Sequence, residues 1–439
     1  MYIKGDVFML NNNAVKNIQH KKTKINYGWV LVSVMLFGAV VNYLDRVNLS
    51  IAGTTIASQF HFTPVQMGLL FSAMLLPYAL ANLPAGWITD KYGEKRLFTI
   101  ATIVWSIATL AAGFSQTFSS LYASRVLLGI AEAPFFICGA KVTQKWFDDK
   151  NRGLATSVIN MGPPIANTIA PPILTIILIS FGWRPMFIGL GLLGLVVTFL
   201  WLTLYKEKPN SNIEIIDAKS PKKKQNLKIS WAILLKHPST WAMMVGNFGL
   251  IYVFWVYLTW IPTYLKTARG FSLSKTGWLA AIPFLAGIVG VPLGGYLSDY
   301  LIKRRNFDPI KARKTIIIFA VITASIFIAP IAYVKSGSVS VVLLTFGFLF
   351  SSMPNGVVWT LATDVAPAKL VGSLGCIQNF AGYLGGSIAP ILTGLIVSRT
   401  GSFKLVFIIS SMMLLMSALT YGIFLKSKIE LKNEPETVQ

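Results

Sequence analysis

The chain has 439 residues, of which 54% are hydrophobic and 13% charged, and its mean hydropathy is +0.62. This composition is too apolar for a soluble protein of this length and indicates a membrane protein. The formal net charge is +23, but the basic residues lie between apolar runs and in the N-terminal tail. That distribution is typical of membrane orientation and argues against a nucleic-acid partner.

Long apolar runs follow one another along the whole chain. A helix that crosses the bilayer core needs about 20 mainly apolar residues. Twelve such runs lie at 29–51, 65–88, 97–114, 121–140, 155–179, 186–204, 241–264, 278–301, 316–334, 339–361, 370–397 and 405–425. We therefore predict an all-α membrane protein with twelve transmembrane helices.

The break between the sixth and seventh runs is long, polar and basic. We predict an N-terminal tail at 1–28, a six-helix bundle at 29–205, a central loop at 206–238, a second bundle at 239–426 and a C-terminal tail at 427–439. The loops after the even-numbered runs carry more Lys and Arg than the opposite loops. This bias predicts a multi-pass protein of the cell membrane with both termini in the cytoplasm.

One loop motif occurs in both halves. A glycine is followed four positions later by an aspartate and then by a cluster of cations. The residues are Gly86, Asp90, Lys91, Gly93 and Arg96 after the second run, and Gly295 and Asp299 after the eighth. We expect the glycines to allow close helix packing, and the charges to form an interhelical latch at the cytoplasmic surface that breaks when the halves rock. Ordinary charged loops are the alternative, but repetition at equivalent places favours two related halves.

Twelve spans, a central loop and the segment GWITDKYGEKR at 86–96 resemble the major facilitator superfamily. The resemblance implies two pseudo-symmetric six-helix bundles around a central cavity that opens alternately to either side.

Four ionisable residues lie inside the apolar runs: Asp45, Arg46, Arg125 and Glu132. A charge at the centre of a membrane helix costs about 2.5 to 3.5 kcal/mol on insertion scales, so we expect these groups to face a wet cavity or one another. Arg125 and Glu132 are seven residues apart, within about 20° of one helix face and roughly 10 Å along the axis. Asp45 and Arg46 are adjacent and diverge by about 100°, so they need not share a role.

These residue types suggest two chemistries. Arg46 stays charged and presents a planar fork of donors, which suits a carboxylate or phosphate. In a poorly solvated cavity the ionised form of Glu132 is disfavoured, so Glu132 suits a proton carrier. Asp45 is a second candidate carrier, and structural pairing with an arginine is its alternative. Arg125 either shares the path with Glu132 or braces neighbouring helices.

Polar and aromatic side chains inside the runs provide candidate substrate ligands. They are Tyr43, Tyr78, Asn160, Asn247, Trp359, Gln378 and Asn379. Hydroxylated substrates need such groups, although each of these residues also suits helix packing or the membrane interface.

NYLDRVNLS at 42–50, RVLLGIAE at 125–132 and QNFAG at 378–382 resemble the anion:cation symporter family of this superfamily. Its members include bacterial carriers of hexonates, hexuronates and aldarates. The resemblance implies that Arg46 binds the substrate carboxylate, that Glu132 and Asp45 couple protons, and that Asn379 binds a sugar-acid hydroxyl. Sugar-acid carriers of this type often have a Gln shortly after the Asn of the fifth span, whereas Met161-Gly162-Pro163-Pro164 follows Asn160 here.

We expect no metal site, organic cofactor or enzymatic activity. Cys138 and Cys376 lie far apart in apolar runs, and the histidines His20, His61 and His237 lie in tails or loops. The expected coupling ion is H⁺, with Na⁺ left open, and the expected partners are a small organic anion and the lipid bilayer, with the monomer as the functional unit.

These observations predict a secondary active transporter that takes up a small organic anion, a sugar acid, together with a proton by alternating access. Three alternatives stay open: an organic-anion or organophosphate exchanger, a drug/proton antiporter of the same fold, and a non-transporting membrane receptor. The exchanger is less favoured because 241–264 contains no Arg or Lys. The antiporter is less favoured because Gly162-Pro163 lacks a trailing glycine pair.

Overall fold

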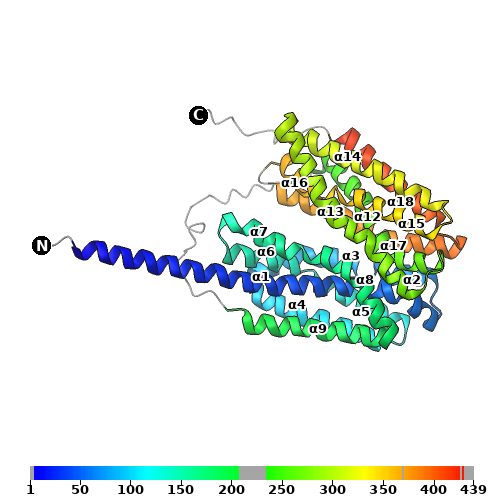
Figure 1. Cartoon of the computed structure of the whole chain (residues 1–439), viewed down its shortest axis with the longest axis horizontal. Coiled ribbons are helices and arrows are strands. Elements are labelled where there is room, and N and C mark those ends of the chain that lie inside the picture. The colour runs from blue at the N-terminus through cyan, green and yellow to red at the C-terminus, as the bar shows by residue number, and fades with distance from the viewer. Residues whose placement is uncertain (1–3, 207–233, 368–369, 426–427, 430–439) are drawn as a thin grey trace.

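The computed structural model describes residues 4–206, 234–367, 370–425 and 428–429 (Figure 1). In this part of the chain the regular structure is helical, and twelve helical spans are long and apolar enough to cross a membrane. The predicted fold class and number of spans are therefore confirmed. Most of the predicted central loop at 206–238 and of the C-terminal tail at 427–439 lies outside the described residues.

Residues 27–205 form the N-terminal half, with six spans. Its helices are α1 (Lys4–Phe60), α2 (Pro64–Ser72), α3 (Leu75–Tyr92), α4 (Glu94–Phe114), α5 (Phe118–Glu132), α6 (Phe135–Trp146), α7 (Asp149–Asn160), α8 (Gly162–Phe181) and α9 (Trp183–Leu204).

Residues 238–425 form the C-terminal half, also with six spans. Its helices are α12 (Pro238–Thr267), α13 (Leu273–Arg305), α14 (Pro309–Ile328), the 3-10 helix η1 (Ala329–Ala332), α15 (Gly337–Ser352), α16 (Asn355–Val365), α17 (Val371–Thr400) and α18 (Lys404–Phe424).

Four spans are interrupted near their middle, and each consists of two helices. The breaks lie between α2 and α3, α5 and α6, α7 and α8, and α15 and α16. Pro134, Pro163 and Pro354 lie at three of them, where the missing N–H and the ring of proline stop a helix from continuing. Interrupted spans are typical of the binding regions of transporters, because backbone polar groups are tolerated at membrane depth only beside protein or a water-filled cavity.

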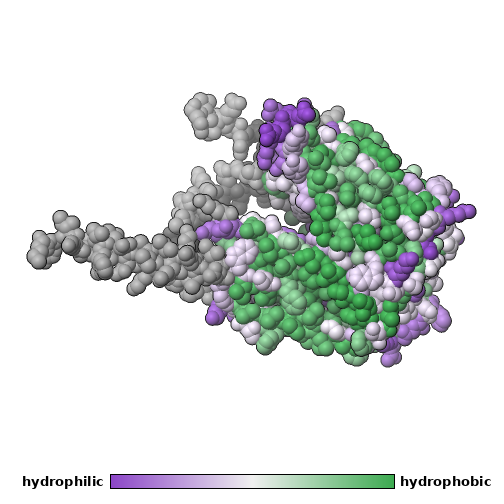
Figure 2. Space-filling model, in the orientation of Figure 1, coloured by the Kyte–Doolittle hydropathy of each residue, from purple (hydrophilic) through white to green (hydrophobic). Residues whose placement is uncertain are grey.

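The surface has an apolar band between two polar ends. Figure 2 shows hydrophobic side chains over the middle of both halves and hydrophilic side chains at the ends. Exposed Ile107, Phe199, Leu285 and Ile326 belong to this band, which suits contact with lipid tails. We name the end where α9 finishes and α12 begins the loop end, and the end that carries Phe62 and Phe403 the far end.

The two halves contact each other at the far end. Ser50 Oγ donates to the Thr259 carbonyl at 2.9 Å, and Ser72 Oγ donates to the Ser387 carbonyl at 2.5 Å. Lys266 Nζ donates to Thr54 Oγ1 at 2.9 Å. Towards the loop end the two lobes part (Figure 2). The structure is therefore closed at the far end.

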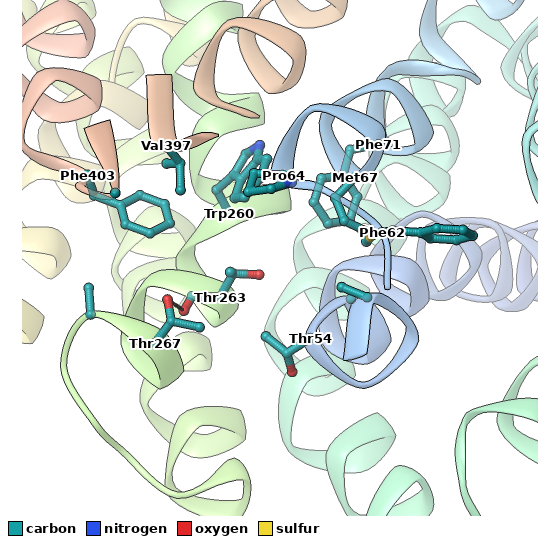
Figure 3. A pocket seen from close by; sticks show the side chains of 14 residues that line it. Thr54, Phe62, Pro64, Met67, Phe71, Trp260, Thr263, Thr267, Val397 and Phe403 are labelled. Atoms are coloured by element: carbon teal, nitrogen blue, oxygen red, sulfur yellow. Dashed lines mark hydrogen bonds between the residues drawn. The ribbon is translucent and has the colours of Figure 1, made fainter. Parts of the chain in front are cut away.

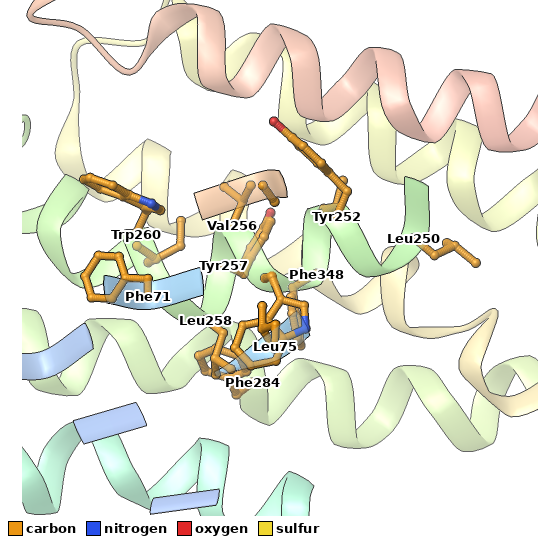
Figure 4. Packing of buried hydrophobic residues seen from close by; sticks show 14 of the residues in the cluster. Phe71, Leu75, Leu250, Tyr252, Val256, Tyr257, Leu258, Trp260, Phe284 and Phe348 are labelled. Atoms are coloured by element: carbon orange, nitrogen blue, oxygen red, sulfur yellow. The ribbon is translucent and has the colours of Figure 1, made fainter. Parts of the chain in front are cut away.

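A continuous apolar core crosses the junction between the halves at the far end. Phe71 and Leu75 of the N-terminal half lie beside residues of α12 (Figure 4). The rings of Phe71 and Trp260 meet edge to face with centroids 5.3 Å apart. A second core cluster, which includes Phe98, Trp105 and Trp201, lies within the N-terminal half. Shape and apolar burial therefore hold the far end closed, together with a few hydrogen bonds, of which the one from Lys266 has a charged donor.

Glycines allow the closest approach between the halves. A Cβ on Gly68 would lie 2.4 Å from the Pro390 carbonyl oxygen, and one on Gly394 would lie 2.3 Å from the Pro64 carbonyl oxygen. The prediction of close helix packing is wrong for Gly86. A Cβ on Gly86 would meet open space. Gly295 does lie where α13 packs on α16, since a Cβ on Gly356 would lie 3.0 Å from the Gly295 backbone nitrogen, and Gly290 and Gly294 make further close contacts of α13.

The aspartates of the repeated motif form ion pairs within their own halves. Asp90 of α3 pairs with Lys141 of α6, which lies outside the motif, so this link is interhelical. Asp299 pairs instead with Lys303 on its own helix, at 3.5 Å. Lys91 lies over the rings of Trp87 and Tyr92, Arg96 is exposed, and Gly93 has a positive φ of 81° that connects α3 to α4. A latch that breaks during rocking stays a prediction.

Gly68→Ala should prevent full closure of the far end, because the new methyl group would overlap the Pro390 backbone. The measurement is a pulsed electron paramagnetic resonance distance between spin labels at Ser58 and Ser402, with both native cysteines replaced. We expect a longer-distance population in the variant. Gly189→Ala, where a Cβ meets open space, should keep the parent distribution, and an unchanged distribution in Gly68→Ala would contradict the proposed packing role.

Candidate substrate and coupling site

The centre of the N-terminal half contains a buried ion pair. Arg46 of α1 donates through Nε to Oε2 of Glu132 at 2.8 Å, and the two side chains are 1% and 0% exposed. Glu132 is the last residue of α5, next to the break at Ala133-Pro134. Arg46 and Glu132 therefore face each other, which is one of the two arrangements expected for the buried charges.

Close helix packing brings the two charges together. Gly129 lies between Arg125 and Glu132 on α5, and a Cβ there would lie 2.2 Å from the Met74 carbonyl oxygen at the α2–α3 break. A second close contact lies between α8 and α1, where a Cβ on Gly162 would lie 2.3 Å from the Ala39 Cβ. This packing leaves the pair little room to be solvated, so each charge depends on the other.

Arg125 makes a different set of contacts. Its Nη1 donates to the Asp45 carbonyl at 2.8 Å and its Nη2 to Asn48 Oδ1 at 2.7 Å. Its guanidinium carbon lies 4.9 Å from the Phe187 ring centre. Arg125 thus connects α5 to α1 through contacts that are separate from the ion pair. Its assignment to proton coupling stays a prediction, and the contacts fit the bracing alternative.

Asp45 is fully buried, and Arg46 pairs with Glu132 rather than with Asp45. Asn48 Nδ2 lies 3.5 Å from Asp45 Oδ1, while Oδ2 has no hydrogen-bond partner among the described residues. A buried carboxylate oxygen without a donor is costly. The position therefore suits a protonated carboxyl or a bound water, and a role in proton transfer stays a prediction.

Tyrosines enclose the Arg46 guanidinium. Its central carbon lies 4.5 Å from the Tyr43 ring centre and 4.7 Å from that of Tyr78. Tyr383 of the C-terminal half packs on Tyr78, with centroids 4.9 Å apart. Arg46 Nη2 has no hydrogen-bond partner within the described residues. The guanidinium thus keeps an unused donor beneath a layer of aromatic rings that spans both halves.

A cavity of ≈ 150 Å³ adjoins Tyr43 between the halves. Its polar lining comes from Asn167 of α8, Ser352 of α15 and Asn355 of α16, and its apolar lining includes Phe254 and Phe284. Asn167 is 5% exposed, and its Oδ1 has no partner in the described part of the chain. Whole-ligand sites usually measure about 300–1,000 Å³, so this space suits one end of a ligand.

The other predicted ligands are placed differently. Asn247 Nδ2 donates to the Gln378 carbonyl at 3.0 Å, which ties α12 to α17. Gln378 is buried with Oε1 unpaired among the described residues, and Asn379 beside it is half-buried. Asn160 and Trp359 have exposed side chains and lie outside the ion-pair cluster. Substrate contacts by these residues stay predictions.

Sequence reasoning missed three residues of this region. Asn48 lies one turn after Asp45 within NYLDRVNLS, and helical i, i+3 spacing is a usable signal for this contact. Asn167 lies seven residues after Asn160 on the same span, but no pattern linked it to Tyr43. Tyr383 reaches Tyr78 from the other half, and one sequence alone carries no signal for that contact.

The arrangement suits binding of an anion that exchanges with an internal partner. A guanidinium binds carboxylates through two parallel N–H donors, and only one side of Arg46 is occupied by Glu132. An incoming carboxylate would compete with Glu132 for the same cation. Among the described residues no cluster of three or more His, Cys, Asp or Glu is placed to hold a metal ion.

Twelve spans in two halves, closed at one end and with a buried ion pair inside the N-terminal half, are typical of a membrane transporter. The family model described as the Major Facilitator Superfamily matches residues 35–390, and the chain belongs to this family.

Relatives and solved structures agree with this assignment. The chain is 32% identical over 409 residues, or 92% of this chain and 89% of the other, to the "Probable L-galactonate transporter" of Escherichia coli (strain K12). It is also 32% identical over 407 residues, or 91% and 94%, to the "Probable sulfoacetate transporter SauU" of Cupriavidus necator. The fold is similar to that of a bacterial homologue of the human lysosomal transporter Spinster, in an inward-facing and occupied conformation, with a TM-score of 0.76, 17% identity and coverage of 90% and 96%.

Breaking the ion pair should cost more than removing it. Arg46→Met leaves Glu132 buried without its cation, and we expect a loss of about 3–5 kcal/mol in unfolding free energy. Adding Glu132→Gln to Arg46→Met should restore most of that loss. Thermal unfolding in detergent of the parent, both single variants and the double variant gives the coupling energy. Additive effects of the two substitutions would show that the pair is energetically unimportant.

Proposed function

We propose that this protein is a proton-coupled symporter that takes up a small organic anion, a sugar acid of the hexonate, hexuronate or aldarate class. The observation that supports it most is the buried pair of Arg46 with Glu132, which joins an anion-binding group to a titratable group. The relative named for L-galactonate supports a sugar acid, and the relative named for sulfoacetate supports a small anion in general.

Charge balance supplies the coupling in this proposal. Arg46 and Glu132 together are neutral, so a carboxylate that binds Arg46 while Glu132 is ionised leaves one excess negative charge at membrane depth. Protonation of Glu132 removes that excess and frees the guanidinium for the substrate. Rocking of the halves is then least costly with both ligands bound or with neither, which is the requirement for symport.

Three tyrosines connect substrate binding at Arg46 to movement of the two halves. Tyr43 and Tyr78 flank Arg46, and Tyr383 of the C-terminal half packs on Tyr78. A substrate on Arg46 therefore lies where the halves meet. Its hydroxyl groups would reach Asn379 of α17 or, past Tyr43, Asn167 and Asn355 in the adjoining cavity.

The loop end is assigned to the cytoplasm by its excess of Lys and Arg. Closure at the far end then makes this an inward-facing state. Substrate would enter when the far-end contacts of Gly68, Ser72 and Gly394 separate. Those contacts are neutral and small, so separation breaks no ion pair.

Glu132→Gln should uncouple transport from the proton gradient, because the glutamine cannot take up or release a proton. In proteoliposomes we expect accumulation of labelled L-galactonate driven by an imposed pH gradient to fall by at least tenfold, while exchange of internal for external substrate continues. Glu94→Gln removes another buried carboxylate, which contacts Lys145 and Tyr205, and should retain gradient-driven accumulation. Accumulation in the parent that survives collapse of the pH gradient would refute proton coupling.

Arg46→Lys should weaken anion binding at least tenfold, since a lysine cannot bind a carboxylate through two parallel donors. The measurement is the thermal shift of purified protein with galactonate, galacturonate, galactarate and sulfoacetate. Arg184→Lys, near the far end, should bind like the parent. A parent stabilised only by sulfoacetate would replace the sugar-acid assignment with a sulfonate, and equal shifts in the parent and Arg46→Lys would remove Arg46 from the site.

A further inference from the structure

The far end of the molecule is exclusively basic. All six far-end connections lie within the stretches 46–89, 95–131, 153–206, 238–298, 309–363 and 365–429, which contain no Asp or Glu. Seven cations lie at this end: Arg184, Lys266, Arg269, Lys275, Lys335, Arg399 and Lys404. Membrane orientation does not explain them, since that rule places cations at the opposite end. A surface with charge of one sign attracts small ions of the other sign.

Three of these cations line one cavity of ≈ 460 Å³ in the C-terminal half. They are Arg269, Lys335 and Lys404, and the described lining includes no carboxylate. The volume falls within the range of about 300–1,000 Å³ typical of small-molecule sites. The lining also includes Tyr264, Tyr333 and the Gly401-Ser402 segment, which add hydroxyl and backbone groups.

The cations of this cavity are held by neighbouring groups. Arg269 is half-buried, and it donates through Nε to the Tyr264 hydroxyl at 2.7 Å and through Nη2 to the Ile331 carbonyl at 3.3 Å. Lys404 Nζ lies 4.4 Å from the Tyr333 ring centre. Lys335 and Lys404 are exposed at the rim. An anion in the cavity would therefore meet one positioned guanidinium and two exposed ammonium groups.

The cavity continues towards the junction of the two halves. Ala268, Gly401 and Phe403 line both this cavity and a second one of ≈ 340 Å³, which lies between α1 and α2 on one side and α12 and α17 on the other. In Figure 3, Thr263 and Thr267 face Thr54 across this second space, with Trp260 and Phe71 above. The basic cavity itself is built wholly from the C-terminal half, so rocking of the halves leaves it intact and reachable.

We propose that the basic cavity is a capture site for small organic carboxylates, which holds the anion at the far-end surface and delivers it to the space between the halves. The inference rests on the proposed function for the identity of the anion, although the site itself needs only a carboxylate. Capture of this kind raises the local anion concentration and lowers the apparent KM. The central site still sets the maximal transport rate.

Uptake by whole cells tests the role in transport. In Lys335→Gln with Lys404→Gln we expect the apparent KM for galactonate to rise about threefold to tenfold with an unchanged maximal rate, and the rise of KM with salt to flatten. Lys275→Gln with Arg399→Gln removes two far-end cations outside the cavity and serves as the matched control. An equal rise of KM in both double variants would show that the far-end cations act only through general electrostatic attraction, and it would overturn the proposed capture site.

Direct binding separates this site from the central one. The probe is ¹³C-labelled gluconate, observed by NMR line broadening with Arg46→Ala protein in nanodiscs of neutral lipid. Broadening that persists in Arg46→Ala and disappears when Lys335→Gln and Lys404→Gln are added supports the capture site, even if the protein transports a different anion. Loss of all broadening in Arg46→Ala alone overturns it. Failure of gradient-driven uptake with retained broadening would count against the proposed function only.

Discussion

A charge inside the bilayer must have a partner, and in this protein Arg46 and Glu132 provide it for each other. The rest of the N-terminal half is arranged around that requirement. Gly129 and Gly162 bring α5 and α8 close to their neighbours, and Arg125 ties α5 to α1 with bonds to Asp45 and Asn48. A buried pair is stable while both members are charged, or while another anion takes the place of Glu132 on Arg46. Loss of one charge without such a replacement destabilises the pair.

The two halves differ in how they use charge. The ion pair and Arg125 belong to the N-terminal half, while α12 and α17 contribute Asn247, Gln378 and Tyr383 to the same region. The closed far end relies on glycine contacts, serine hydroxyls and aromatic rings. Apart from the hydrogen bond from Lys266 to Thr54, these contacts are neutral, so their separation would break no ion pair.

Basic groups occur at successive depths along the expected path of an anion. The far end carries seven cations without a nearby acid in sequence, Arg46 lies at mid-depth, and the loop end carries Lys91, Arg96 and the cluster at 303–305. Among the ion pairs of the described residues, the pair of Arg46 with Glu132 is the one whose acidic member is completely buried. Under the proposed function an anion is attracted at both surfaces, but it competes with a protein carboxylate at Arg46, where selectivity and coupling would be decided.

The sequence alone determined the twelve spans, the division into halves and the four charged residues within them, because hydrophobic length and the cost of buried charge are local properties. It also determined that Asp45 and Arg46 point apart, since helix geometry sets that angle. It misplaced close helix packing at Gly86, and it missed Asn167 and Tyr383. Only the tertiary structure decided which carboxylate pairs with Arg46, which end is closed and where the cavities lie, because these depend on how helices distant in sequence pack against one another.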